Sequence, residues 1–214
     1  MININALAQD CFNTLNAKDK DGNFVPVTVE MIAYVQAFYT AFIGGKTNNP
    51  TVTGTGLPAA PLQSGAASGG HVTGVLASAM AAEMSSAFGE SSPAKILAAC
   101  EGVCETINND SKVSFASGKI TGTCGATPTS PGPLNGGAGT GGKLSDLLGP
   151  TMAALVASKM GIDLNDTLND FHTVLCNHII NNAEVEYASG KVTGSFLAGG
   201  GSLMGGTAID GSMS

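Results

Sequence analysis

The segment most typical of an enzyme is a glycine-rich stretch that ends in a lysine. Residues Gly137–Lys143 read Gly-Ala-Gly-Thr-Gly-Gly-Lys, which satisfies G-x-G-x-x-G and most of a phosphate-binding P-loop. In such a loop the backbone N–H groups and the lysine hold phosphate oxygens. Leu144, however, stands where the loop needs a Ser or Thr hydroxyl for magnesium, and no apolar strand precedes the glycines. Nucleotide binding is therefore an alternative rather than the expected function.

A second group of side chains has the chemistry to bind zinc. Cys100 and Cys104 lie four residues apart, and His172 and Cys176 occupy the same positions 72 residues later. Thiolates and imidazoles are common zinc ligands, so two such helix faces could together form a Cys3His site. The spacing within each pair is not Cys-x2-Cys, and buried cysteine often acts only as a small apolar residue. We therefore expect no metal and no cofactor, with these four residues as the zinc candidates.

The sequence shows no set of catalytic residues. Nucleophilic catalysis needs a base beside the nucleophile, and the three histidines are His71, His172 and His178. His71 lies among glycines, while His172 and His178 are six residues apart and so point to different faces of a helix. The chain is expected not to be an enzyme.

All of these residues belong to a sequence that repeats three times. Two motifs recur at an offset of 72 residues, Pro61–Gly70 as Pro133–Gly142 and Ala116–Gly122 as Ala188–Gly194. Two separate motifs with one offset indicate tandem repeats. The first unit is the divergent copy. We place the units at residues 1–70, 71–142 and 143–214.

Each unit is predicted to start with a pair of helices. Matching apolar stripes occur at helical spacing in the second and third units: Ile96, Ala99, Val103 and Ile107, then Leu168, Phe171, Leu175 and Ile179. Thr28 and either Asp163 or Asn165 are placed to cap helices. Alternating residues around Ser117-Gly118 and Ser189-Gly190 predict a short β-hairpin. The expected fold class is mainly α, with three tandem repeats of a helix pair, a short β-hairpin and a glycine-rich extended arm.

The glycine-rich arms differ from the rest of each unit. They hold most of the 30 glycines and few large apolar side chains. Burial of so little apolar surface cannot offset a backbone entropy cost of about 1–2 kcal/mol per residue, so we expect neighbouring chains to order the arms. The apolar exceptions are the predicted interaction anchors: Leu134, Phe196, Leu197, Leu203 and Met204.

Composition disfavours several kinds of partner. The net charge is -7, and all nine basic residues are lysine, so the chain would repel nucleic acid and anionic membranes. The first residues lack the basic and apolar parts of a signal peptide, and no apolar run is long enough to span a membrane. We expect the partners to be other copies of the chain and other structural proteins, with no nucleic acid and no membrane insertion.

In general character, the low charge, small residues, repeated helical units and long arms resemble virion structural proteins of tailed bacteriophages, such as decoration, connector or baseplate proteins. The resemblance implies a structural protein of the virion, assembled in the host cytoplasm, that joins neighbouring subunits through its arms. Two alternatives stay open: a nucleotide-binding enzyme that uses Gly137–Lys143, and an exported surface or adhesin-like protein.

Overall fold

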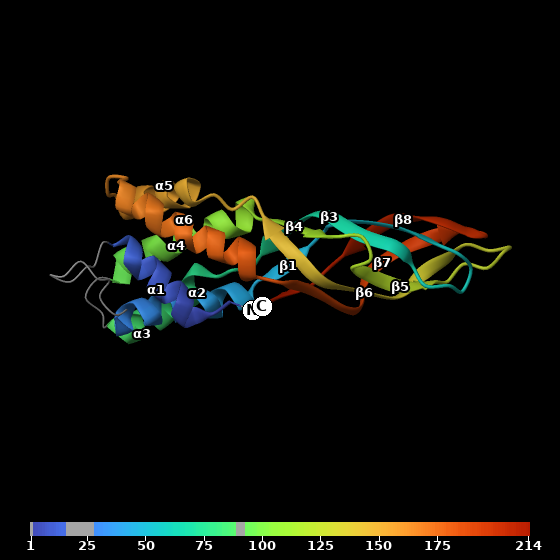
Figure 1. Ribbon diagram of the computed structural model, residues 1–214, viewed down its shortest axis with the longest axis horizontal. Coiled ribbons are helices and arrows are strands. Elements are labelled where there is room, and N and C mark those ends of the chain that lie inside the picture. The colour runs from blue at the N-terminus through green and yellow to red at the C-terminus, as the bar shows by residue number, and fades with distance from the viewer. Residues whose placement is uncertain (1, 16–27, 89–92) are drawn as a thin grey trace. The chain divides into compact units, whose positions relative to one another are not determined.

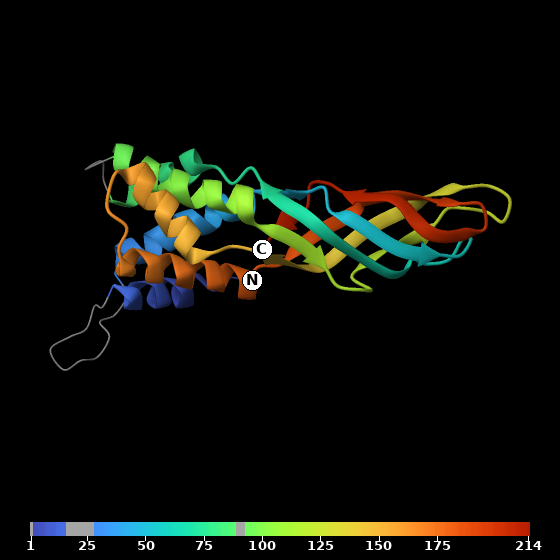
Figure 2. The ribbon, with the colours of Figure 1, turned by 90° about the horizontal axis from the view of Figure 1, so that it is seen from above.

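The computed structural model describes residues 2–15, 28–88 and 93–214. The chain forms two compact units, and each unit takes one part of every repeat. A helical unit holds residues 1–45, 74–110 and 146–183, and a β unit holds residues 46–73, 111–145 and 184–214. Figure 1 and Figure 2 show that each unit combines segments from the beginning, middle and end of the chain. The structure is 43% helical and 35% strand, so the expected mainly α class is wrong.

Within the described residues, six helices form the helical unit, two from each repeat. They are α1 (Ile4–Thr14), α2 (Val29–Gly44), α3 (Ala77–Phe88), α4 (Pro93–Asp110), α5 (Gly149–Met160) and α6 (Asp166–Asn182). Each helix packs on the next one in the chain, and α6 packs on α1 (Figure 1). The three helix pairs therefore close a ring.

Polar side chains satisfy free backbone N–H groups at the predicted starts of two helices. The Thr28 hydroxyl accepts a hydrogen bond from the Met31 N–H at the start of α2, and Asn165 accepts one from Leu168 at the start of α6. These two caps confirm the predicted helix starts. The end of α5 is marked by Gly161 in the left-handed conformation, which glycine adopts without steric cost.

Antiparallel strands form the β unit. They are β1 (Lys46–Asn48), β2 (Thr51–Gly56), β3 (Gln63–Thr73), β4 (Lys112–Phe115), β5 (Ile120–Cys124), β6 (Gly132–Ser145), β7 (Val185–Leu197), β8 (Gly200–Ala208) and β9 (Ser212–Met213). β2 pairs with β3, β3 with β4, β4 with β6, β6 with β7, β7 with β8, and β8 again with β2. β5 follows β4 in the chain and also pairs with β6. The result is a closed six-stranded barrel with additional short strands.

The glycine-rich arms are strands of this barrel rather than extended arms. The three arms supply β3, β6 and β8, and each pairs both with its own repeat and with the next repeat in cyclic order. Because these pairings satisfy the backbone inside the chain, no neighbouring chain is needed to order the arms.

The predicted short hairpin is also corrected. Ser189-Gly190 lies within β7, and Ser117-Gly118 forms a turn between β4 and β5, which are not paired with each other in the described residues. Gly118 and Gly190 have φ values of 81° and 82°, so each bends the chain at one left-handed residue. The hairpins form farther along, between β5 and β6 and between β7 and β8.

A recurring three-residue motif explains why the barrel closes. It reads Val52-Thr53-Gly54 in the first repeat, Ile120-Thr121-Gly122 in the second and Val192-Thr193-Gly194 in the third, and its first residue is buried each time. The carbonyl of that residue lies where a Cβ would stand on a glycine of the preceding repeat. The three contacts are equivalent: Gly65 on Ile120, Gly137 on Val192 and Gly206 on Val52. Each repeat therefore receives its neighbour in the same way, and the third closes on the first.

Equivalent core positions meet in layers whose members differ in size. Gly56, Cys124 and Phe196 each stand four residues after the first residue of the motif. A Cβ on Gly56 would lie 2.8 Å from Cβ of Cys124 and 3.1 Å from Cε1 of Phe196. The ring of Phe196, the thiol of Cys124 and the hydrogen atom of Gly56 thus share a space that is too small for three large side chains. Three identical chains could not divide the space in this way, whereas one chain with three repeats can.

Candidate functional site

The glycine-rich segment Gly137–Lys143 does not form a phosphate-binding loop. It lies within β6, where Gly137 pairs with Val192 and Gly139 pairs with Ile120. A P-loop instead turns between a strand and a helix, so that its free N–H groups face the phosphate. Lys143 forms an exposed ion pair with Glu184 at 3.1 Å. The alternative of nucleotide binding therefore loses its proposed loop.

The cysteines among the zinc candidates lie in the interior of the helical unit. Cys100 contacts Met84 at 3.4 Å between sulfur atoms, and Cys176 contacts Met152 at 3.9 Å. Burial raises the pKa of Cys100 to about 11 and those of Cys104 and Cys176 to about 12, which disfavours the thiolate that zinc needs. Among residues 2–15, 28–88 and 93–214, no three His, Cys, Asp or Glu side chains form a metal cluster. That the protein binds no zinc stays a prediction.

His172, the fourth zinc candidate, is also buried. Its Nδ1 lies 2.8 Å from the carbonyl of Leu168, one turn earlier on α6. Burial lowers the pKa of His172, and the hydrogen bond to Leu168 opposes this only in part. The ring is therefore neutral at pH 7.

The five predicted interaction anchors separate into two groups. Leu134, Phe196 and Leu203 are buried inside the β unit of the same chain. Leu134 and Leu203 fill the space that a side chain on Gly122 or Gly194 would need. Leu197 and Met204 are 60% and 47% exposed. Only these two anchors are available to a partner.

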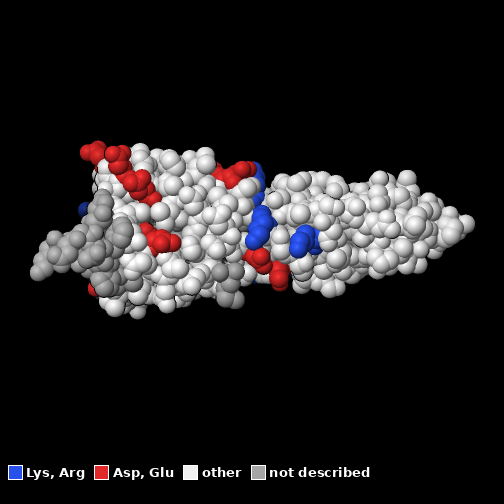
Figure 3. Space-filling view, in the orientation of Figure 1, with Lys and Arg blue, Asp and Glu red and all other residues white. Residues whose placement is uncertain are grey.

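A large part of the β unit carries no charge. Three stretches lack Asp, Glu, Lys and Arg altogether, residues 47–73, 120–142 and 192–209, although 12% of the whole chain is charged. We call their exposed residues the uncharged surface, and Figure 3 shows the white face of the β unit to which they contribute. It presents matching hydroxyl residues from all three repeats: Thr53 and Thr55, Thr121 and Thr123, and Thr193 and Ser195. It also exposes the apolar residues Leu57, Leu197 and Met204.

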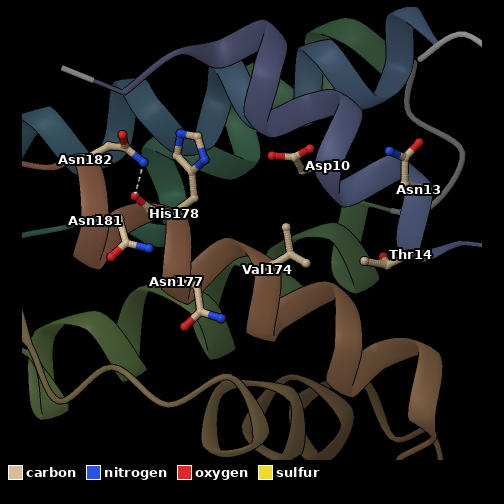
Figure 4. Close-up of a pocket in the computed structure, with 8 residues that line it drawn as sticks. All are labelled: Asp10, Asn13, Thr14, Val174, Asn177, His178, Asn181 and Asn182. Carbon is tan, nitrogen blue, oxygen red and sulfur yellow. Dashed lines mark hydrogen bonds between the residues drawn. The ribbon is translucent and has the colours of Figure 1, made fainter.

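A polar groove of about 490 Å³ lies between α1 and α6 (Figure 4). Its lining residues are Asp10, Asn13 and Thr14 of α1 and Val174, Asn177, His178, Asn181 and Asn182 of α6. At the matching place between α4 and α5, Gly102 packs directly on Val156, and Lys159 pairs with Glu105 at 2.8 Å. The residues of α6 that correspond to Gly102 and Glu105 are Val174 and Asn177. Val174 does not allow the close helix contact of a glycine, and Asn177 has no charge to form an ion pair. The α6–α1 boundary therefore lacks two contacts that hold α4 and α5 together.

Asp10 and His178 face each other across this groove in Figure 4. Nε2 of His178 is buried and has no hydrogen-bond partner in the described structure. Burial lowers the pKa of His178, and the nearby Asp10 carboxylate raises it part of the way back. Thr14 is the only hydroxyl residue among the described residues of the lining, and it donates to the carbonyl of Cys11 at 2.6 Å. These residues can bind polar groups, but none of them is an activated nucleophile.

Acidification is expected to destabilise the protein through buried His172 and half-buried His178. Because burial lowers the pKa values of His172 and His178, the unfolded chain takes up protons first as the pH falls below about 6.5. The free energy of unfolding should therefore fall from pH 7 toward pH 5, which thermal unfolding across this range would measure. The double variant His172→Gln/His178→Gln should show a flatter profile. An unchanged profile in that variant would assign the pH dependence to other groups.

The sequence contained no signal for the groove, because Asp10 and His178 belong to different repeats and meet only when α6 closes on α1. In the described part of the chain, no helix is long and apolar enough to cross a membrane. Comparison with protein-family models, curated proteins and solved structures gives no match, so the residues and geometry of the chain itself carry any conclusion about its function.

Proposed function

We propose that the chain is a structural assembly protein in which three fused repeats take the place of a trimer. The observation that supports this best is the cyclic set of contacts in the β unit, Gly65 on Ile120, Gly137 on Val192 and Gly206 on Val52. Such a chain presents three similar faces around one axis and needs no second subunit to do so. The partner that matches it best has threefold symmetry itself, as many large particles do.

The uncharged surface is the part of the chain that we assign to contact with other structural proteins. Interface cores are depleted of charged residues, because burying an unpaired charge is costly. Glycine and small hydroxyl residues allow a partner backbone to come close, and Leu57, Leu197 and Met204 supply exposed apolar area. This assignment replaces the extended arms as the means of joining subunits.

A virion of a tailed bacteriophage is the kind of assembly that we propose, in a decoration, connector or baseplate position and assembled in the host cytoplasm. The support is the general resemblance in composition together with the threefold arrangement. Other structural proteins of the particle, and other copies of the chain, are the proposed partners. Catalysis plays no part in this proposal.

Charges placed on the uncharged surface are expected to prevent incorporation into the particle. The double variant Thr121→Lys/Thr193→Lys changes two exposed positions of the outer strand face, so folding should be unaffected within about 0.5 kcal/mol. Two desolvated charges in an interface should lower the amount that co-sediments with purified particles at least tenfold. Quantitative mass spectrometry of the particles would measure this.

The matched control is Thr151→Lys, which adds the same charge at an exposed position of α5 in the helical unit. It should be incorporated as well as the parent chain. Normal incorporation of the double variant would exclude the uncharged surface as the contact, and particles without any of the parent chain would exclude the virion role.

A further inference from the structure

A second cavity, of about 500 Å³, lies in the helical unit and differs in character from the polar groove. All three repeats contribute to its walls, and apolar side chains such as Ala99, Val103, Met160 and Phe171 line most of it. Its volume is in the range of cavities that bind small molecules, about 300–1,000 Å³. The cavity is open to solvent, so a small molecule can enter it.

Four polar side chains also line this cavity: Tyr34, Asn165, Thr167 and His172. His172 is only 3% exposed, and its Nδ1 bonds to the carbonyl of Leu168 at 2.8 Å. A carbonyl can only accept, so Nδ1 carries the proton and Nε2 is left as an acceptor. None of the hydrogen bonds of the described residues uses that Nε2. The cavity therefore contains an acceptor, carried by a buried side chain, that no hydrogen bond of the described residues occupies.

The aromatic rings around this acceptor are fixed by mutual contacts. Tyr34 and Phe171 meet edge to face with ring centroids 5.5 Å apart, and Phe171 and His172 meet in the same manner at 5.2 Å. These contacts hold the polar groups in place before any ligand binds.

The cavity favours uncharged groups. Burial raises the pKa of Tyr34, and the thiols of Cys11, Cys100, Cys104 and Cys176 raise it further. Burial lowers the pKa of His172. Both side chains are neutral at pH 7, and among the described residues that line the cavity there is no Lys or Arg to pair with an anion.

We infer that this cavity binds a small neutral alcohol or phenol, with its apolar body against Ala99, Val103 and Phe171 and its hydroxyl donating to Nε2 of His172. The inference is independent of the proposed role in assembly. It assigns the chain a ligand site that neither the repeat nor the composition of the sequence indicated.

Binding can be tested with 2-naphthol, a fluorescent phenol that is neutral at pH 7. The chain has no Trp, so naphthol emission can be followed without a strong protein background. We expect saturable binding to the full chain with one site per chain. The ring-matched anion 2-naphthoate should bind at least tenfold more weakly, because its charge would be desolvated without a partner. Equal binding of 2-naphthoate, or no saturable binding of 2-naphthol, would overturn the inference.

Two variants locate the site. His172→Phe keeps an aromatic ring but removes the acceptor, and it should weaken 2-naphthol binding about fivefold to tenfold while leaving naphthalene binding unchanged. Ala99→Phe should fill the cavity and abolish binding of both, with circular dichroism as the check on folding. If Ala99→Phe does not fold, Met160→Trp provides the same test from another wall. Full binding in a folded, filled variant would place the ligand elsewhere and overturn the assignment.

Discussion

Replacing Gly137 with alanine is expected to lower the free energy of unfolding by about 3 kcal/mol. Gly137 has an ordinary negative φ, so the loss comes from space rather than from backbone conformation. The new methyl group would overlap the carbonyl of Val192 in the next repeat, and a paired main chain cannot turn aside as a flexible side chain can. Urea unfolding followed by circular dichroism would measure the loss as a lower midpoint.

The threefold arrangement predicts the same loss of stability at two further glycines. Gly65→Ala and Gly206→Ala place the same methyl group against Ile120 and Val52, so each should cost a similar amount. Gly44→Ala is the matched control, because a Cβ there meets nothing within 4 Å and alanine is the better helix former. It should leave stability unchanged or raise it by up to about 1 kcal/mol. A harmless Gly137→Ala would contradict the close packing of repeats, and losses at Gly137 alone would contradict their equivalence.

The helical part of the fold was predictable because its signals are local. Apolar side chains at helical spacing and the caps Thr28 and Asn165 depend only on neighbours within a few residues. The same is true of the motif that contains Thr121 and Thr193, whose recurrence was visible without knowledge of what it contacts. Local signals therefore gave the helices, whereas the hairpins predicted at Gly118 and Gly190 form farther along the chain.

The barrel could not be predicted from the same kind of signal. Strands are normally recognised by β-branched and aromatic residues in alternation, whereas β6 contains Gly136, Gly137, Gly139, Gly141 and Gly142. Its glycines are useful because they leave room for other groups, as Gly142 does for the ring of Phe115. Phe115 lies on β4, so this contact is not visible in the sequence of β6 alone. Composition alone therefore made the arm resemble a flexible linker.

For the candidate sites, too, the sequence showed the local pattern but not the contacts between distant segments. The repeat placed His172 and Cys176 in register with Cys100 and Cys104, which suggested a shared metal site. Equivalence in sequence, however, does not bring two copies into direct contact. In the helical unit Cys100 and Cys176 instead contact thioethers. His172 bonds to its own helix and lines a cavity whose other walls come from distant segments.

Exchanging two members of the layer Gly56, Cys124 and Phe196 is expected to restore much of the stability that each single change removes. Phe196→Gly should cost about 4 kcal/mol, because it leaves a cavity where a 1% exposed ring was packed. Gly56→Phe alone should prevent normal folding, because a ring cannot fit beside Cys124 and Phe196. The double variant Gly56→Phe/Phe196→Gly keeps the contents of the layer and should recover more than half of the larger loss.

A double-mutant cycle from urea unfolding would measure this coupling, with the exposed neighbour Leu197→Ala as a control that changes stability by less than about 0.5 kcal/mol. Recovery requires that the ring reach the same central space from the first repeat as from the third. If the repeats are related by threefold symmetry, the two entry positions are equivalent and the coupling is large. A double variant that is no more stable than the sum of the two single changes would show that the position of the ring, and not only the volume of the layer, is fixed by the third repeat.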